Sequence, residues 1–201
     1  MDGIQLPLSI ATYRITAPKL NVLYPVIKAP MPPGGSHINR VIVEQVHQLI
    51  KDQGYGQNPQ TESSGYYELK TNQRQILSLS LYNYAFSGGA HGLVLQKSLT
   101  FDSQTGKSYA LSGLFKPGAD YVKRLSEIVA AQIKERDIPL LVPFTGIRPD
   151  QDYYIADKAL VIYFAVYEIT AYVYQFPYFP ISVYSIQDII DENGPLGKMM
   201  Y

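Results

Sequence analysis

Hydrophobic and polar residues alternate along several stretches of this 201-residue chain, with the period of two that is typical of β-strands. The clearest alternation covers residues 66–71 and 77–82 on either side of a turn near residues 72–74. It predicts a β-hairpin with one buried face. The opening stretch to Ile27 alternates more loosely and contains prolines, which predicts edge strands broken by turns.

Two other segments carry hydrophobic residues at intervals of three or four, which is typical of a helix with one buried face. We expect the first helix to begin at Ser36, whose hydroxyl is suited to cap it, and to end near Gly54. The second should begin after Pro117 and end before Pro139. The residues expected to be buried are Ile38, Val41, Val46, Leu49 and Ile50 in the first, and Val122, Leu125, Ile128, Val129 and Ile133 in the second.

The last part of the chain returns to strands. Tyr153 and Ile155 precede a turn at Asp157 and Lys158, and the run 160–166 is apolar on both faces, which predicts a central strand. Residues 177–201 suggest a short strand, a helical turn at 185–190 and a loose end. Strands and helices come in blocks, so we expect an α+β fold, an antiparallel sheet meander with two main helices packed on it.

We expect one α+β domain over residues 1–201. The alternative division is a small N-terminal subdomain, 1–70, followed by a main domain at about 75–190.

Composition and charge exclude several classes of function. The 17 basic and 17 acidic residues balance and form no charged run, so nucleic acid is not an expected partner. Cysteine is absent, which excludes disulfides, thiolate metal sites and a cysteine nucleophile. The longest nearly apolar run, 159–167, is too short to cross a membrane. The first three residues do not resemble a signal peptide, which is compatible with a cytoplasmic protein or with a removed leader or anchor.

Few residues offer catalytic or metal-binding chemistry, so we expect no metal and no cofactor. Glu44 and His47 share a face of the first helix, but a solvated polar face is the favoured interpretation. The 18 tyrosines, with no tryptophan, are suited to contact a partner. Half-buried strand positions are the favoured explanation for any one of them.

One segment, Tyr84 to Gly92, reads Tyr-Ala-Phe-Ser-Gly-Gly-Ala-His-Gly, a strand that ends in glycines around a histidine. Glycine allows positive φ angles and lets the backbone approach a ligand closely, and an imidazole there could donate, ligate or titrate. A hairpin corner that needs glycine for its own geometry, with His91 bonded to a neighbouring carbonyl, is an equal alternative.

Together with residues 102–107, 111–115, 153–155 and 161–169, this segment resembles one family. It is similar to the extracytoplasmic domain of unknown function found in RsiV-type anti-sigma factors and in PdaC-type polysaccharide deacetylases. The resemblance covers about residues 24–184. It implies a non-catalytic, Gram-positive, extracytoplasmic or cell-surface module that binds a protein, lysozyme in the anti-sigma members, or a cell-wall glycan. Catalysis in the deacetylases would belong to a separate domain.

The residues expected to bind the ligand come from the two most specific segments of that resemblance. They are Tyr84, Ser87, Gly88, Gly89, His91, Gly92, Tyr167 and Glu168. The alternative function is a hydrolase that uses His91 as general base, with Glu168 or Asp102 as its partner.

Overall fold

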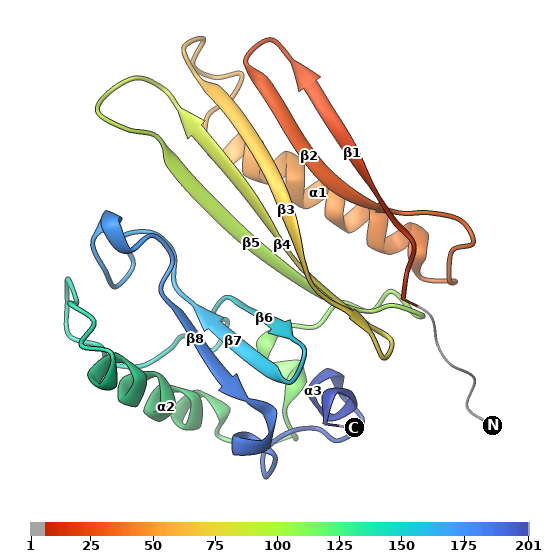
Figure 1. Cartoon of the computed structure of the whole chain (residues 1–201), viewed down its shortest axis with the longest axis vertical. Helices are drawn as coiled ribbons and strands as arrows, with labels where there is room; N and C mark the ends of the chain where they lie inside the picture. Colours follow the sequence, from red (N-terminus) through yellow and green to blue (C-terminus); the bar gives the residue numbers. More distant parts are fainter. Residues whose placement is uncertain (1–6, 201) are drawn as a thin grey trace. The chain divides into compact units, whose positions relative to one another are not determined.

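A computed structural model describes residues 7–200 and divides the chain into two compact units, one that ends at Ser108 and one that begins at Tyr109 (Figure 1). Each unit has its own sheet and its own helices. The α+β class predicted from the sequence is confirmed, although the strands form two sheets rather than one. The division between the units falls later in the chain than the alternative boundary at residues 70–75.

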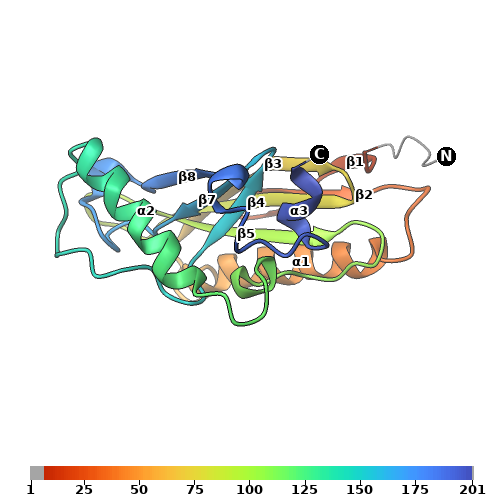
Figure 2. The same cartoon turned by 90° about the horizontal axis from the view of Figure 1, so that it is seen from below.

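The first unit is a five-stranded sheet in the order β1-β2-β3-β4-β5, with one helix, α1, on one of its faces (Figures 1 and 2). The elements are β1 (Ile10–Ala17), β2 (Leu20–Ile27), α1 (Gly35–Asp52), β3 (Glu62–Gln73), β4 (Ile76–Phe86) and β5 (Leu93–Asp102). The strands β2 and β3 are parallel and the other pairs are antiparallel. The sheet is therefore mixed, because α1 returns the chain to the end of the sheet where β2 began.

The helix α1 buries the apolar face that the sequence predicted, with Ile38, Val46, Leu49 and Ile50 in the core and Val41 partly buried. It begins after Gly34 rather than Ser36. Close packing excludes a side chain at position 34, because a Cβ at Gly34 would lie 2.1 Å from the backbone nitrogen of Gly106. The Gly34 nitrogen also donates to the carbonyl of Gln104, at 2.8 Å.

The predicted hairpin is present as β3 and β4, and its turn lies at Arg74 and Gln75, which both have positive φ angles. The strand β4 is buried on both faces rather than one, and it lies between β3 and β5 in the sheet. Hydroxyl groups hydrogen-bond to one another on the face away from α1. The pairs are Ser78 with Thr100 at 2.9 Å and Ser80 with Ser98 at 2.8 Å.

The second unit is a three-stranded antiparallel sheet with short helical segments around it. Its elements are η1 (Leu111–Leu114), α2 (Tyr121–Glu135), β6 (Tyr153–Ala156), β7 (Ala159–Tyr163), η2 (Tyr172–Tyr174), β8 (Tyr178–Ser182), η3 (Val183–Ile186) and α3 (Pro195–Met199). As predicted, β7 is the central strand, although it ends at Tyr163 rather than Val166.

The helix α2 lies within the predicted limits and buries Leu125, Val129 and Ile133. The expectation of a loose C-terminal end was wrong. Residues 195–199 form α3, in which the side chains of Leu196 and Met199 are fully buried. These two residues are apolar anchors, and their burial stabilises a segment too short to be a stable helix alone.

Candidate functional site

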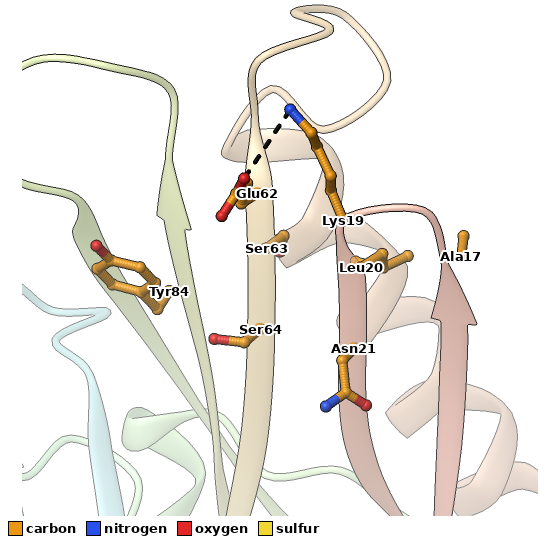
Figure 3. Close-up of a pocket in the computed structure, with 8 residues that line it drawn as sticks. All are labelled: Ala17, Lys19, Leu20, Asn21, Glu62, Ser63, Ser64 and Tyr84. Carbon is orange, nitrogen blue, oxygen red and sulfur yellow. Dashed lines mark ion pairs between the residues drawn. The ribbon is translucent and has the colours of Figure 1, made fainter.

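A pocket of about 350 Å³ lies at the end of the first sheet where β2 and β3 begin and β4 ends (Figure 3). Asn21, Ser64 and Tyr84 stand in one row across these strands, because Asn21 pairs with Ser64 and Ser64 pairs with Tyr84. The row faces away from α1, since the neighbouring residues Val22 and Ala85 are buried on the other side. All three side chains of the row are exposed.

An ion pair stands at the rim of this pocket (Figure 3). The ammonium group of Lys19 lies 3.9 Å from the carboxylate of Glu62, and both side chains are about half exposed or more. Lys19 occupies the turn between β1 and β2 with a φ of 62°, and its ammonium group also donates to the carbonyl of Pro59 at 3.4 Å. The pocket therefore offers a cation, an anion, neutral hydrogen-bonding groups and an aromatic ring.

The ring of Tyr84 occupies space that a side chain at position 92 would fill. A Cβ at Gly92 would lie 2.4 Å from the ring carbons of Tyr84 and 2.5 Å from the carbonyl oxygen of Ala85. Gly88 and Gly89 serve a different purpose, because their φ angles are 93° and 103°, a backbone conformation that favours glycine. The glycines of the predicted corner thus supply the turn, and Gly92 supplies the space that the Tyr84 ring fills.

A second pocket, of about 410 Å³, lies beside the same corner on the end of α1. Ser87, Gly88, His91 and Gly92 line it from the corner, and Asp52 and Gln53 line it from α1. The exposed His91 ring hydrogen-bonds through Nδ1 to the carbonyl of Gly92, at 2.9 Å. The structure therefore brings six of the predicted site residues to one end of the first sheet. They are Tyr84, Ser87, Gly88, Gly89, His91 and Gly92.

The corner is tied to its surroundings by side-chain hydrogen bonds. The hydroxyls of Ser87 and Thr61 are bonded at 2.8 Å. The amide of Gln53 donates to the carbonyl of Leu93, at 2.7 Å, and accepts from Asn83. The turn that carries Gly88 and Gly89 is thereby anchored on both sides.

Asp102 cannot act as the partner of His91 in hydrolysis. It lies at the far end of β5, roughly 30 Å away along an extended strand. Its carboxylate accepts the backbone N–H groups of Gln104 and Thr105, at 3.0 and 2.8 Å, and so closes the turn predicted at residues 102–107. The expected pairing of His91 with Asp102 is wrong. Glu168 belongs to the second unit, and its pairing with His91 stays a prediction.

In the second unit, Glu168 holds a turn together. One carboxylate oxygen accepts the backbone N–H of Ala165, at 2.7 Å, and the other accepts from the guanidinium of Arg148 and, at 3.5 Å, from the amide of Gln151. Tyr167, inside this turn, has a φ of 69° and is 49% exposed.

The polar groups that suggested metal binding are dispersed. Glu44 and His47 are exposed on α1, and His37 accepts a hydrogen bond from Arg40 at 2.8 Å. Within residues 7–200, no group of three or more histidine, cysteine or acidic residues could hold a metal ion. No helix in that same range is long and apolar enough to cross a membrane.

Sequence reasoning missed Lys19, Asn21, Glu62 and Ser64. Lys19 and Asn21 reach the pocket through the parallel pairing of β2 with β3, which the expected antiparallel meander did not contain. Glu62 and Ser64 lie on β3 beside Tyr84, but no local pattern marked them as part of a site. The helical segment between two strand segments was the available signal, since a crossover helix joins parallel neighbours.

The two units correspond to two segments of known families. Residues 17–94 match the family described as deacetylase PdaC, and residues 112–184 match a protein family of unknown function, DUF3298. Each match covers less than half of the chain. The resemblance to the domain found in PdaC-type deacetylases is confirmed by the two matches.

One relative of known name is the peptidoglycan-N-acetylmuramic acid deacetylase PdaC of Bacillus subtilis (strain 168). It is 25% identical over 112 residues, which cover 52% of this chain and 24% of the relative. The match therefore spans about a quarter of that protein.

Two solved structures have a fold similar to that of this chain. A DUF3298 family protein of Pseudomonas aeruginosa PAO1 has a TM-score of 0.73 at 16% identity, over 95% of this chain and 98% of that one. A DUF3298 family member of Bacteroides fragilis NCTC 9343 has a TM-score of 0.64 at 13% identity, over 96% and 97%. These likenesses concern the fold alone, and they cover nearly the whole chain.

Proposed function

We propose that this protein is a non-catalytic, extracytoplasmic binding module of a bacterial cell envelope, and that the pocket at the end of the first sheet holds a cell-wall glycan. The row of Asn21, Ser64 and Tyr84 carries this proposal. A half-exposed aromatic ring offers an apolar surface to the C–H groups of a sugar, and the amide and hydroxyl beside it match sugar hydroxyls.

The position of the pocket in the chain supports a glycan. All the residues that line it, from Ala17 to Tyr84, lie within the segment 17–94 that matches deacetylase PdaC. The named relative acts on N-acetylmuramic acid in peptidoglycan. A cell-wall glycan is therefore the first ligand to test. We propose an extracytoplasmic location because the cell wall lies outside the cytoplasm.

The chemistry of the pocket favours binding over hydrolysis. Glycoside hydrolysis uses a pair of carboxylates, whereas Glu62 is the one acidic residue among the eight that line the pocket, and it is paired with Lys19. Binding needs only a surface whose groups are held in fixed positions, and the strand register holds Asn21, Ser64 and Tyr84 in one row.

Titration calorimetry of the purified chain with the tetrasaccharide of N-acetylglucosamine tests the proposal. We expect saturable binding and a loss of about tenfold or more in Tyr84→Ala, because the ring supplies the apolar contact. Two variants are controls. Tyr13, which is 45% exposed on β1, and His91, which lines the second pocket, should both be replaceable by alanine without loss of affinity. No saturable heat with the tetrasaccharide, or equal losses in all three variants, would contradict the proposal.

A protein ligand is the second candidate, and the surface of the second unit favours it. Tyr167, Val173 and Tyr174 are 49%, 78% and 45% exposed, and the rings of Tyr167 and Tyr172 lie 5.7 Å apart. Exposed aromatic and apolar residues that lie close together are typical of protein contacts.

The test for a protein ligand is a titration with lysozyme at low and moderate salt, because a basic protein can adhere through unspecific charge. Saturable binding that persists at moderate salt and is weakened by Tyr174→Ser would support this candidate. The Tyr13→Ala variant is again the control. Heat that disappears at moderate salt, or that Tyr174→Ser does not change, would exclude lysozyme binding at this surface.

A further inference from the structure

A second exposed tyrosine lies on the same face of the first sheet as the Tyr84 pocket. Tyr66 follows Ser64 by two residues on β3, and it pairs with Tyr82 just as Ser64 pairs with Tyr84. Residues two apart on a strand point to the same face. Tyr66 therefore faces away from α1, diagonal to Tyr84, and it is 51% exposed against 39% for Tyr84.

The ring of Tyr66 is held in a fixed position. It stacks on the ring of Tyr82 at a centroid distance of 4.7 Å and an angle of 12°. Tyr82 is 5% exposed, and its hydroxyl donates to the carboxylate of Glu68 at 3.0 Å. Glu68 in turn accepts from Lys70. One face of the exposed ring thus rests on a buried, hydrogen-bonded neighbour, which lowers the entropic cost of binding.

The charge of Glu68 contributes to this support. Its hydrogen bond to Lys70, and a weaker one to Tyr82, lower the pKa of the Glu68 carboxyl, against a smaller opposing effect of burial. Burial, and secondly the charge of Glu68, raise the pKa of the Tyr66 hydroxyl. At neutral pH the Tyr66 hydroxyl is therefore neutral and the nearby Glu68 carboxylate is ionised.

The spacing of the two exposed rings limits the ligand. Diagonal neighbours on paired strands lie about 7–8 Å apart, which is more than one sugar ring can contact at once. From this geometry we infer that Tyr66 forms a second sugar subsite, so that the ligand of the sheet is a glycan chain that lies across β3 and β4 rather than a single sugar. This inference rests on the proposed function, since the first subsite is the Tyr84 pocket.

Calorimetry with the dimer, tetramer and hexamer of N-acetylglucosamine tests this arrangement. We expect the tetramer to bind about tenfold more tightly than the dimer, and the hexamer to add little. Tyr66→Ala should remove the gain from dimer to tetramer and leave the affinity for the dimer unchanged. Tyr66→Phe, which keeps the ring, should retain the gain, and Tyr13→Ala is the control for an exposed tyrosine elsewhere on the sheet.

A direct measurement covers the event that Tyr66→Ala fails to fold. In a protein with isotope-labelled tyrosine rings, the resonance that Tyr66→Phe removes belongs to Tyr66. It should shift with the tetramer and stay unchanged with the dimer. Equal affinities for dimer and tetramer, a gain that persists in Tyr66→Ala, or an unmoved Tyr66 resonance would overturn the second subsite while leaving the Tyr84 site in place. No binding at any length would overturn the proposed function itself.

Discussion

The corner around Gly88–Gly92 and the turn at residues 164–169 were predicted as two halves of one ligand site, and the structure gives them different internal chemistry. Each combines an exposed tyrosine with backbone at positive φ. At the corner, the side chains line open pockets. At the turn, the Glu168 carboxylate is engaged by a backbone N–H, by Arg148 and by Gln151. A charged residue in a segment that is typical of a family is thus not a binding residue by that fact alone. Its hydrogen bonds within the protein must be known first.

The largest expected effect concerns the turn. Glu168→Ala leaves the Ala165 N–H without its acceptor and removes one of the three carboxylates near the Arg148 guanidinium. It should lower the free energy of unfolding by about 3 kcal/mol. Urea unfolding followed by circular dichroism measures this change. Affinity for the tetrasaccharide should remain unchanged, because the role assigned to Glu168 is structural.

The matched control is Asp150→Ala. Asp150 lies 3.5 Å from the same guanidinium but its side chain is 86% exposed, so the change should be below about 0.5 kcal/mol. Equal effects of the two substitutions would show that Glu168 does not hold the turn.

A somewhat smaller effect is expected at the corner. Gly92→Ala places a methyl group against the Tyr84 ring and the Ala85 carbonyl, and should cost about 2 kcal/mol of stability while it also weakens tetrasaccharide binding. Gly89→Ala is the comparison, since open space surrounds Gly89 and only its positive φ is strained. It should cost about 1–2 kcal/mol with binding intact. Thermal unfolding and calorimetry on both variants distinguish the effect of the steric clash at Gly92 from the effect of the strained backbone at Gly89.

A third substitution tests the hydrogen-bonding part of the pocket. Asn21→Ala should weaken tetrasaccharide binding by about fivefold, the equivalent of about 1 kcal/mol for one hydrogen bond. Thr16, which pairs with Asn21 on β1 but does not line the pocket, is the control. Calorimetry that finds Thr16→Ala as harmful as Asn21→Ala would contradict the assigned row.

The smallest effect is a dependence on pH. The folded state lowers the pKa of Glu68 below its ordinary value of 4.5, so Glu68 contributes stability above that value and loses it as the pH falls through the folded-state pKa. Urea unfolding between neutral pH and about pH 3 should therefore show a smaller acid loss in Glu68→Gln than in the wild type. Parallel curves for the two proteins would exclude this contribution.

The pattern of the sequence was sufficient for the elements of the fold but insufficient for their pairing. The apolar spacing of Leu125, Val129 and Ile133 located α2, and the two-faced run after Leu160 located the central strand β7. The parallel pairing of β2 with β3 joins residues about 40 positions apart. That pairing depends on where α1 packs, and periodicity carries no information about it.

The same limit explains what the sequence revealed of the site. Tyr84 and Gly92 belong to one short segment with an unusual run of glycines, and their contact could be anticipated from the hairpin they flank. Asn21 and Ser64 carry no local signal, because a polar residue in a strand resembles any solvated position. The buried Ser78 and Ser80 illustrate the opposite error, since they alternate like surface residues and are satisfied inside the fold by Thr100 and Ser98.

The most direct test of the pocket at the end of the first sheet is a titration of the ¹⁵N-labelled chain with the tetrasaccharide of N-acetylglucosamine, followed by amide chemical shifts. We predict saturable shifts at residues 19–21, 62–66 and 84–85, with the amides of residues 164–174 unmoved. Shifts confined to residues 164–174, or no saturable shift anywhere, would contradict the assignment of the glycan site to the first sheet.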